Sequence, residues 1–431
     1  MTIKIKLILA LMLIGQTIFA QQNIPIIKAT SKKIAIRDGN QGLTKYWSHL
    51  SANLKPVVYD ISKINSNRKL TFFTDIDSIS FDIKPNSKYP FKVILNSKDT
   101  CSAEISTIIP TYYKDCNGCV ITSDTIPFIL GDDHYIHIKG KVNNSEILDL
   151  IFDTGAGSCL LNENGQKKAK MKLDGVSDGE GTSGATQNDM YSSANFLQIA
   201  SLNWKNLPIG YIDYKGSINT DGVIGYNIFE DKIVEINYDK SIMIIHSKLP
   251  QDITDYKSAN LRHDLNGTFI EATLTNKKKN YKGWFLFDTG GSLTLLVSGS
   301  YSSENSLFGS MESIAKTKGT GNGKGFFEEE IVTLPNFNLL GFNIPNLPIH
   351  LAASDKSFYG EAGIIGNNIL KRFNTIIDYP NATVYLKPNG LMNATFEKKK
   401  NNTLVYTISL IGLVLLFLII VLRVKRKKVN K

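Results

Sequence analysis

The chain has 431 residues, more than one hydrophobic core usually organises, so its length predicts two or three domains. Hydrophobic residues make up 42% and charged residues 20%, a composition that excludes a largely disordered protein. The net charge is +10, but two basic residues in the first 20 and six in the last nine leave about +2 for residues 21–402. The charge therefore gives no indication of a nucleic-acid-binding surface.

The first residues have the pattern of a secretory signal peptide. Lys4 and Lys6 give a positive start, residues 7–14 are apolar, and Ala20 is a small residue at the expected cleavage point. An N-terminal membrane anchor is the alternative, but the apolar run is short for a helix that crosses a bilayer. We expect residues 1–20 to be a cleaved signal and the rest of the chain to be exported.

The C-terminal end predicts a single transmembrane helix. Residues 403–422 are almost wholly apolar and uncharged, follow a linker at residues 391–402, and are long enough to cross a bilayer core. The basic residues at 423–431 favour the cytoplasmic side and argue against a lipid-anchor signal, the alternative interpretation. We expect a single-pass protein of the cell membrane, with a periplasmic or extracellular body and a cytoplasmic C-terminus. The many Asn, Lys and Ile residues suggest a bacterial cell envelope.

The cysteines are compatible with export but do not define a pairing. An exported location permits disulfides among Cys101, Cys116, Cys119 and Cys159. The spacing of Cys116 and Cys119 also fits a redox or zinc pair, but no βαβ pattern surrounds them and no second ligand pair follows. A structural disulfide or plain thiols are favoured.

Residues 21–125 are expected to form a separate small β-domain of the sandwich kind. Apolar residues recur at every second position, as in Ile79, Phe81 and Ile83, which is the period of half-buried strands. We find no catalytic set of residues in this segment. A packing or partner-binding module is favoured over an inhibitory prosegment.

Residues 126–250 and 251–390 contain an internal repeat with three landmarks in the same order. The landmarks are, in pairs, an apolar strand ending in Asp-Thr-Gly at 150–155 and 285–290, Asn-Leu-Pro-Ile at 206–209 and 346–349, and Gly-x-Ile-Gly at 222–225 and 363–366. From the aspartate to the second landmark the spacing is 53 and 58 residues, and to the last glycine it is 72 and 78. Alternating patterns begin and close each copy, so the repeat predicts two similar β-rich lobes.

The aspartates of the repeat, Asp153 and Asp288, are the candidate catalytic residues. One Asp-Thr-Gly alone is also an ordinary turn, but two copies that each follow an apolar strand predict a facing pair. Two carboxylates within hydrogen-bond distance cannot both ionise, so they share one proton. The ionised member would take a proton from a water that attacks a peptide carbonyl, and the protonated member would donate to the oxyanion. This chemistry needs no metal or cofactor.

The motifs resemble the pepsin and retropepsin superfamily of aspartic peptidases over residues 128–388. In that superfamily a hydrophobic-Gly turn packs beneath each Asp-Thr-Gly loop, and the matching residues here are Ile224, Gly225, Ile365 and Gly366. The resemblance implies an active site between the lobes, with Thr154 and Thr289 bracing the loops and Gly155 and Gly290 completing them. Turn capping is the ordinary alternative for the threonines.

Other features of the superfamily are matched only in part. Ala156 and Gly291 follow the glycines, where pepsin-like enzymes commonly have serine, so we expect a compact tandem of retropepsin-like lobes. Glycine-rich segments at 179–184 and 319–325 are candidate hairpin flaps, with disordered loops as the alternative. His134 and His137 fall in a strand pattern that would place them on opposite faces, which argues against a shared metal.

Together these patterns predict a mainly β, membrane-anchored aspartic endopeptidase, a hydrolase that acts on polypeptides without cofactor, metal or nucleic acid. Pairing of the lobes within one chain is favoured over an obligate homodimer. The alternative is a catalytically silent, retropepsin-like peptide-binding or scaffolding protein of the cell envelope. Intact aspartates in both copies favour the peptidase. The cleavage specificity and the role of the N-terminal domain stay open.

Overall fold

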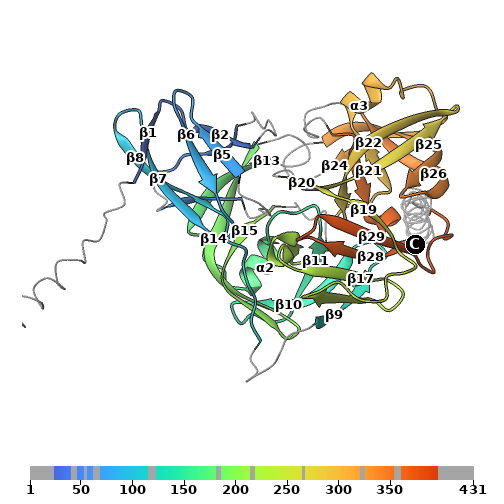
Figure 1. Ribbon diagram of the computed structural model, residues 1–431, viewed down its shortest axis with the longest axis horizontal. Coiled ribbons are helices and arrows are strands. Elements are labelled where there is room, and N and C mark those ends of the chain that lie inside the picture. Colours follow the sequence, from blue (N-terminus) through green and yellow to red (C-terminus); the bar gives the residue numbers. More distant parts are fainter. Residues whose placement is uncertain are drawn as a thin grey trace, which may run out of the picture. The chain divides into compact units, whose positions relative to one another are not determined.

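The fold comes from a computed structural model that is dominated by β-strands (Figure 1). The described residues are 24–39, 46–52, 56–61, 68–114, 123–180, 186–213, 219–264, 267–320, 326–353 and 361–396. The chain up to Met392 forms one unit, and a second unit begins at Asn393.

The predicted signal peptide, transmembrane helix and basic tail lie outside the described residues. Among the helices that are described, none combines the length and the apolar character needed to cross a membrane. Cys116 and Cys119 also lie outside the described part, whereas Cys101 and Cys159 are buried free thiols. Burial raises the pKa of the Cys159 thiol to about 12, so this thiol stays protonated.

The N-terminal domain has two four-stranded sheets around a common core. Their orders are β1-β7-β8-β4 and β3-β2-β5-β6. The strand bounds are β1 (Ile26–Ala29), β2 (Lys33–Asp38), β3 (Tyr46–His49), β4 (Val57–Asp60), β5 (Arg68–Phe73), β6 (Ser78–Ile83), β7 (Lys88–Leu95) and β8 (Asp99–Ser106).

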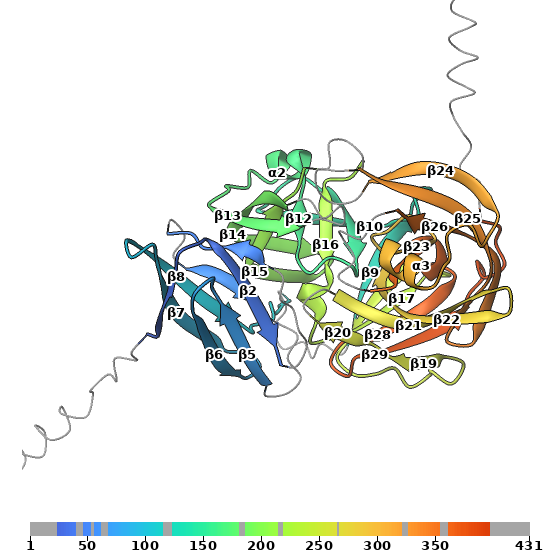
Figure 2. The same ribbon diagram turned by 90° about the horizontal axis from the view of Figure 1, so that it is seen from above.

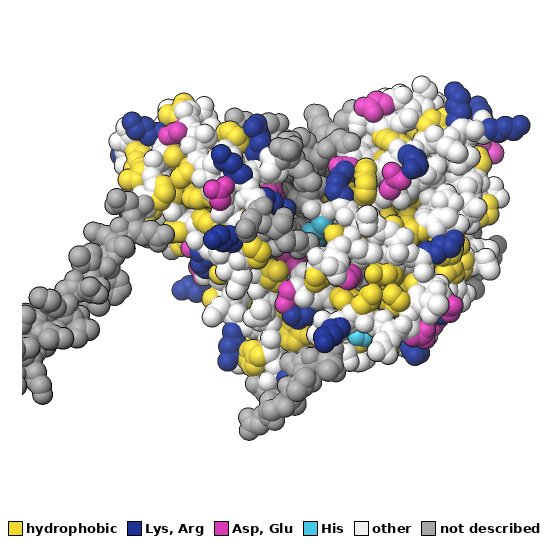
Figure 3. Space-filling model, viewed as in Figure 1, with side chains coloured by type: hydrophobic (Ala, Val, Ile, Leu, Met, Phe, Trp, Pro, Cys, Tyr) yellow, Lys and Arg dark blue, Asp and Glu magenta, His cyan; other side chains and the backbone are white. Residues whose placement is uncertain are grey.

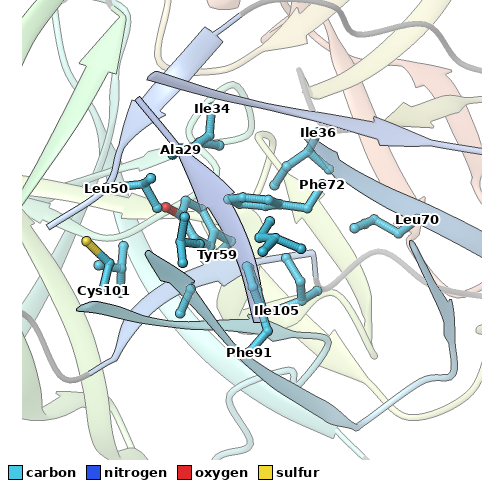
Figure 4. Packing of buried hydrophobic residues seen from close by; sticks show 14 of the residues in the cluster. Ala29, Ile34, Ile36, Leu50, Tyr59, Leu70, Phe72, Phe91, Cys101 and Ile105 are labelled. Carbon is cyan, nitrogen blue, oxygen red and sulfur yellow. The ribbon is translucent and has the colours of Figure 1, made fainter. Parts of the chain in front are cut away.

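Alternating apolar residues of both sheets meet in this core, as a β-sandwich requires. Phe72 of β5 lies between Tyr59 of β4 and Phe91 of β7, with ring centroids 5.2 and 4.8 Å away (Figure 4). Both contacts have the edge-to-face geometry that aromatic rings prefer. The rings therefore join the two sheets into one domain.

Lobe 1 comprises the elements from β9 to β18. Their bounds are β9 (Ser123–Leu130), β10 (Ile136–Val142), β11 (Leu148–Asp153), β12 (Leu160–Leu161), α2 (Glu163–Lys168), β13 (Gly175–Glu180), β14 (Thr186–Ile199), β15 (Leu202–Tyr211), β16 (Gly222–Gly225), the 3-10 helix η1 (Tyr226–Phe229), β17 (Ile233–Asn237) and β18 (Ile242–His246).

Lobe 2 comprises the elements from β19 to β29, whose strands curve strongly in Figure 2. Their bounds are β19 (Lys257–Asn260), β20 (Arg262–Asp264), β21 (Gly267–Asn276), β22 (Lys279–Asp288), β23 (Leu295–Val297), α3 (Gly299–Glu304), β24 (Ser313–Thr320), β25 (Phe326–Leu339), β26 (Phe342–Ala352), β27 (Gly363–Gly366), α4 (Asn367–Leu370), β28 (Phe373–Asp378) and β29 (Thr383–Pro388).

The two lobes repeat the same strand order, which confirms the predicted tandem unit. Lobe 1 has the order β13-β14-β15-β12-β16-β11-β10, and lobe 2 has β24-β25-β26-β23-β27-β22-β21. In each lobe the aspartate strand pairs in parallel with the Gly-x-Ile-Gly strand, so that Asp153 lies opposite Gly225 and Asp288 opposite Gly366. The repeated landmarks are therefore the adjacent central strands of each lobe.

The closing strands of the two copies pair with each other. Strand β17 of lobe 1 is antiparallel to β28 of lobe 2, with Ile233 opposite Asp378. The sheet of lobe 1 thereby continues through β9, β18 and β17 into β28, β29 and β19. Since the strands share backbone hydrogen bonds, the lobes are joined by more than their loops.

The predicted placement of His134 is wrong. His134 ends a turn in which its N–H donates to the Gly131 carbonyl at 2.9 Å, and its φ is +73°. The strand β10 begins only at Ile136, so only His137 lies in it. The polar turn residues at 131–134 interrupt the alternation that predicted a longer strand.

Both glycine-rich flap candidates connect the strands of a hairpin. Strands β13 and β14 pair from Gly175 to Tyr191, and β24 and β25 pair from Ser313 to Val332. The connecting residues 181–185 and 321–325 lie outside the described residues.

Charged side chains are mixed on the face shown in Figure 3. Lys and Arg are scattered among Asp and Glu there and do not merge into one basic area. This distribution agrees with the nearly neutral body expected from the sequence.

Candidate active site

The aspartate loops of the two lobes are joined by what we call the threonine clasp, formed by Thr154 and Thr289. Each threonine N–H donates to the hydroxyl of the other at 3.0 Å. The Thr154 hydroxyl also donates to the Phe287 carbonyl at 2.6 Å, and the Thr289 hydroxyl donates to the Phe152 carbonyl at 2.9 Å. Both threonines are 0% exposed, so water cannot compete for these bonds. These bonds are the ones expected of threonines that brace the two loops against each other.

The glycine after each threonine lies against the aspartate of the other lobe. A Cβ added to Gly290 would lie 2.1 Å from Cγ of Asp153, and one added to Gly155 would lie 2.7 Å from Oδ1 of Asp288. Real Cβ contacts are longer than either distance. Only glycine permits the two loops to approach so closely.

The clasp and the glycines bring the two aspartates within hydrogen-bond reach of each other. The carboxyl groups of Asp153 and Asp288 share a hydrogen bond. Oδ1 of Asp153 accepts from the N–H groups of Gly155 and Ala156 at 2.7 and 3.0 Å, and Oδ1 of Asp288 accepts from Gly290 at 2.8 Å. Both aspartates are half-buried, so the pair is dehydrated and yet open to solvent on one side.

This environment favours a single shared proton. Loss of hydration raises the pKa of both carboxyl groups, and the negative charge of Asp153 raises the pKa of Asp288 further, well above its ordinary value. Asp153 accepts from two N–H groups and Asp288 from one, a difference that favours the ionised form of Asp153 relative to that of Asp288. One member of the pair can then accept a proton while the other donates one.

A Gly-x-Ile-Gly turn supports each loop from beneath. In lobe 1 the Tyr226 N–H donates to the Ala156 carbonyl at 3.1 Å, and in lobe 2 the Asn367 N–H donates to the Gly291 carbonyl at 2.6 Å. A Cβ on Gly225 would lie 2.6 Å from the Ala156 oxygen, so the turn needs glycine. The prediction that these turns pack under the aspartates is confirmed.

The sequence interpretation missed Asn367, the residue after the turn in lobe 2. Its side chain is fully buried, accepts from the Tyr238 hydroxyl at 2.6 Å and donates to the His134 carbonyl at 2.6 Å. Asn367 therefore links the loop of Asp288 to lobe 1. The sequence does contain a signal for it. The residue after the last glycine of the repeat is Tyr226 in lobe 1 but Asn367 in lobe 2, a polar residue at a position expected to be buried.

The site contains no evident ligand set for a metal. Within the part of the chain that the structure describes, no three His, Cys, Asp or Glu side chains converge in a way that would hold a metal ion. Two surface hollows of about 390 and 380 Å³ lie elsewhere, the first beside Asp378 and Tyr385 and the second beside Phe128 and His137. Neither hollow is lined by the paired aspartates.

Comparison with known protein families agrees with this geometry. Residues 138–228, which hold the first aspartate loop and its supporting turn, match a family described as aspartyl protease. The fold is similar to the crystal structure of an aspartic proteinase from Irpex lacteus, with 12% sequence identity, 64% of this chain and 100% of that chain covered, and a TM-score of 0.43. No curated protein matches the chain. The family match confirms the resemblance to pepsin- and retropepsin-like aspartic peptidases that the motifs predicted.

Proposed function

We propose that the protein is a membrane-anchored aspartic endopeptidase that hydrolyses peptide bonds with a water held between Asp153 and Asp288. The observation that carries this proposal is the half-buried pair of carboxyl groups that share a hydrogen bond where the lobes meet. The threonine clasp supports it, because a rigid pair needs little reorganisation during the reaction.

We assign the roles of the two aspartates from the backbone N–H groups that each carboxyl group accepts. Asp153, ionised and stabilised by two N–H donors, takes a proton from the water, whose oxygen attacks the carbonyl carbon of the substrate. Asp288 donates its proton to the carbonyl oxygen, so a neutral gem-diol forms. The C–N bond breaks as Asp153 passes its proton to the leaving nitrogen and Asp288 recovers a proton from a gem-diol hydroxyl. The pair ends in its starting state.

The test is cleavage of a mixed peptide library by the full-length chain in detergent, from mildly acidic to neutral pH. We expect the Asp153→Asn and Asp288→Asn variants each to lose activity by about 10³-fold or more, because each removes one of two obligatory proton carriers. Asp255→Asn is the matched control, since Asp255 forms only a surface ion pair with Lys387.

Two results would contradict the assignment. Either aspartate variant cleaving as well as the parent would exclude a shared catalytic role. A folded parent without cleavage at any pH would favour the alternative, a silent peptide-binding or scaffolding protein of the cell envelope.

The cellular location is part of the same proposal and rests on sequence patterns alone. We propose that residues 1–20 direct export, that residues 403–422 span the membrane, and that the lobes act on polypeptides outside it. Protease added outside intact cells should digest the lobes and spare the basic C-terminal tail. Digestion of the tail alone would show the reverse orientation.

A further inference from the structure

The N-terminal domain is followed by a short segment that lies on lobe 1, residues 112–114, which we call the strap. The backbone of Tyr113 pairs with that of Asn203 in β15, and each N–H donates to the carbonyl of the other, at 2.9 and 3.0 Å. The strap is therefore bound to lobe 1 by main-chain hydrogen bonds, as a short antiparallel strand would be.

Side chains of the strap also pack on lobe 1. The ring of Tyr112 meets the indole of Trp204 edge-to-face, with ring centroids 5.4 Å apart. Lys114 forms an ion pair with Asp124, whose side chain is buried. A buried carboxylate that loses its cationic partner is strongly destabilised, so this ion pair favours the bound state of the strap.

Trp204 connects the strap with the strand that carries Asp153. It is 0% exposed and contacts the ring of Phe229 at 5.7 Å, and Phe229 in turn contacts Phe152 at 6.0 Å. Phe152 directly precedes Asp153, and its carbonyl accepts a hydrogen bond of the threonine clasp. The strap thus covers one end of an aromatic row whose other end lies at the candidate active site.

Aliphatic residues take the place of two of these rings in lobe 2. Counted from the Asn-Leu-Pro-Ile segment, Ile344 is equivalent to Trp204, and counted from the Gly-x-Ile-Gly segment, Leu370 is equivalent to Phe229. The larger aromatic surface therefore belongs to the lobe on which the strap lies.

A short connection joins the strap to the body of the N-terminal domain. Thr107 is 1% exposed, and its hydroxyl donates to the Lys84 carbonyl of that domain at 2.7 Å. Residues 108–111 alone separate Thr107 from the strap, and Pro110 restricts their backbone. Strand β3 of the domain also contacts β13 of lobe 1. While the strap is bound, the domain is held close to lobe 1.

We infer that the N-terminal domain is a permanent third part of the folded protein, docked on lobe 1 by the strap, and not an inhibitory segment that is released. Release would uncover Trp204 and deprive Asp124 of its ion pair. Docking also supports the aromatic row behind Asp153, so that it sustains activity, a consequence that rests on the proposed function.

The test uses the full-length chain in detergent, with a protease recognition sequence inserted between Val120 and Ile121 and an affinity tag at the C-terminus. A thiol reductant excludes disulfides between the fragments. After cleavage, the N-terminal fragment should stay bound to the tagged remainder. Tyr112→Ala should raise the dissociation constant of this fragment by about 10- to 100-fold, because it removes an aromatic pair and its buried area.

Thr111→Ala is the matched control, because Thr111 is exposed and directly precedes Tyr112. It should leave the dissociation constant unchanged. Thermal unfolding of each uncleaved variant identifies any loss of fold. Lys114→Ala, which removes the ion pair with Asp124, should also weaken binding, so it tests the strap even if Tyr112→Ala unfolds.

Peptide hydrolysis then separates support from inhibition. The cleaved parent should keep the rate of the uncleaved chain, and removal of the fragment from cleaved Tyr112→Ala should lower the rate by about tenfold or more. A fragment that leaves the cleaved parent at micromolar concentration overturns the inference, as does a rise in rate after release. A folded parent without activity overturns the proposed function instead, whereas retention of the fragment still decides whether the domain is docked.

Discussion

The loops of Asp153 and Asp288 have the same fold but different surroundings. Both end an apolar strand, both contribute one threonine to the clasp, and both rest on a Gly-x-Ile-Gly turn. The loop of Asp288 is additionally tied to lobe 1 by hydrogen bonds of the buried Asn367 side chain, whereas the equivalent Tyr226 of lobe 1 packs its ring against His263 and Tyr379 of lobe 2.

This comparison separates two requirements of a shared-proton pair. Closeness of the carboxyl groups is a symmetric requirement, and the paired threonines and glycines meet it with equivalent contacts from each lobe. Unequal proton affinity is an asymmetric requirement, because one member must be the base and the other the acid. The difference between the lobes, Asn367 in place of Tyr226, lies next to the loop of Asp288, the aspartate that we assign as the acid.

The largest loss of activity is expected when the glycines that contact the aspartate of the opposite lobe are replaced. Gly290→Ala places a methyl group 2.1 Å from Cγ of Asp153, so the carboxylate must move by about 1 Å, which costs on the order of 10²-fold in kcat/KM or more. Gly155→Ala, with a nearest approach of 2.7 Å, should also inactivate the protein but less severely. Peptide hydrolysis measures both.

The control for the glycine variants is Gly390→Ala, where the added methyl group would meet its nearest neighbour at 3.4 Å, an ordinary contact. Its activity should equal that of the parent. Full activity in Gly290→Ala would show that the aspartates are farther apart in solution than the hydrogen bond requires.

Replacing either threonine of the clasp should lower the free energy of unfolding by a large and nearly equal amount. Thr154→Val keeps the shape but leaves the Phe287 carbonyl and the Thr289 N–H unpaired in a dry interior, at a cost of about 2–5 kcal/mol. Thr289→Val should cost the same within about 1 kcal/mol, since its bonds are equivalent, and the double variant should cost less than the sum. Urea unfolding provides the measurement.

Thr71→Val serves as the control for the clasp, because the Thr71 hydroxyl bonds Ser80 at an exposed site of the N-terminal domain. It should change stability by no more than about 0.5 kcal/mol. Unequal losses of stability in Thr154→Val and Thr289→Val would contradict the interpretation that the two threonines contribute equally to the clasp.

The smallest effect is a pH dependence of stability. The pKa of Asp288 is raised above 3.8, so between about pH 4 and the raised value the folded chain retains a proton that the unfolded chain releases. Each rise in pH within that window therefore lowers the stability of the parent. Asp288→Asn carries no such proton, so its unfolding free energy relative to the parent should increase from about pH 4 to pH 7.

Thermal unfolding across this pH range checks the prediction, with Asp255→Asn as a control that keeps the parental slope. A constant difference between Asp288→Asn and the parent at all pH values would mean that Asp288 titrates as an ordinary exposed carboxyl group. The interpretation of one shared proton would then be wrong.

The sequence alone determined the features that depend on local order and on repetition. Alternating apolar residues such as Ile79, Phe81 and Ile83 predicted strands, because burial of one sheet face imposes a period of two. The duplicated Asp-Thr-Gly and Gly-x-Ile-Gly motifs predicted two equivalent lobes with the aspartates at their contact. The strand order and the clasp agree with both expectations.

Only the tertiary structure decided which residues distinguish the two halves of the site. The bond from Asn367 to His134 joins positions 233 residues apart, and β17 pairs with β28 although each closes a different copy. Asn367 and His134 are common residue types in no recognisable motif, and periodicity carries no information on contacts over such separations. Their role follows from the chain's path, which places a turn of one lobe beside the aspartate loop of the other.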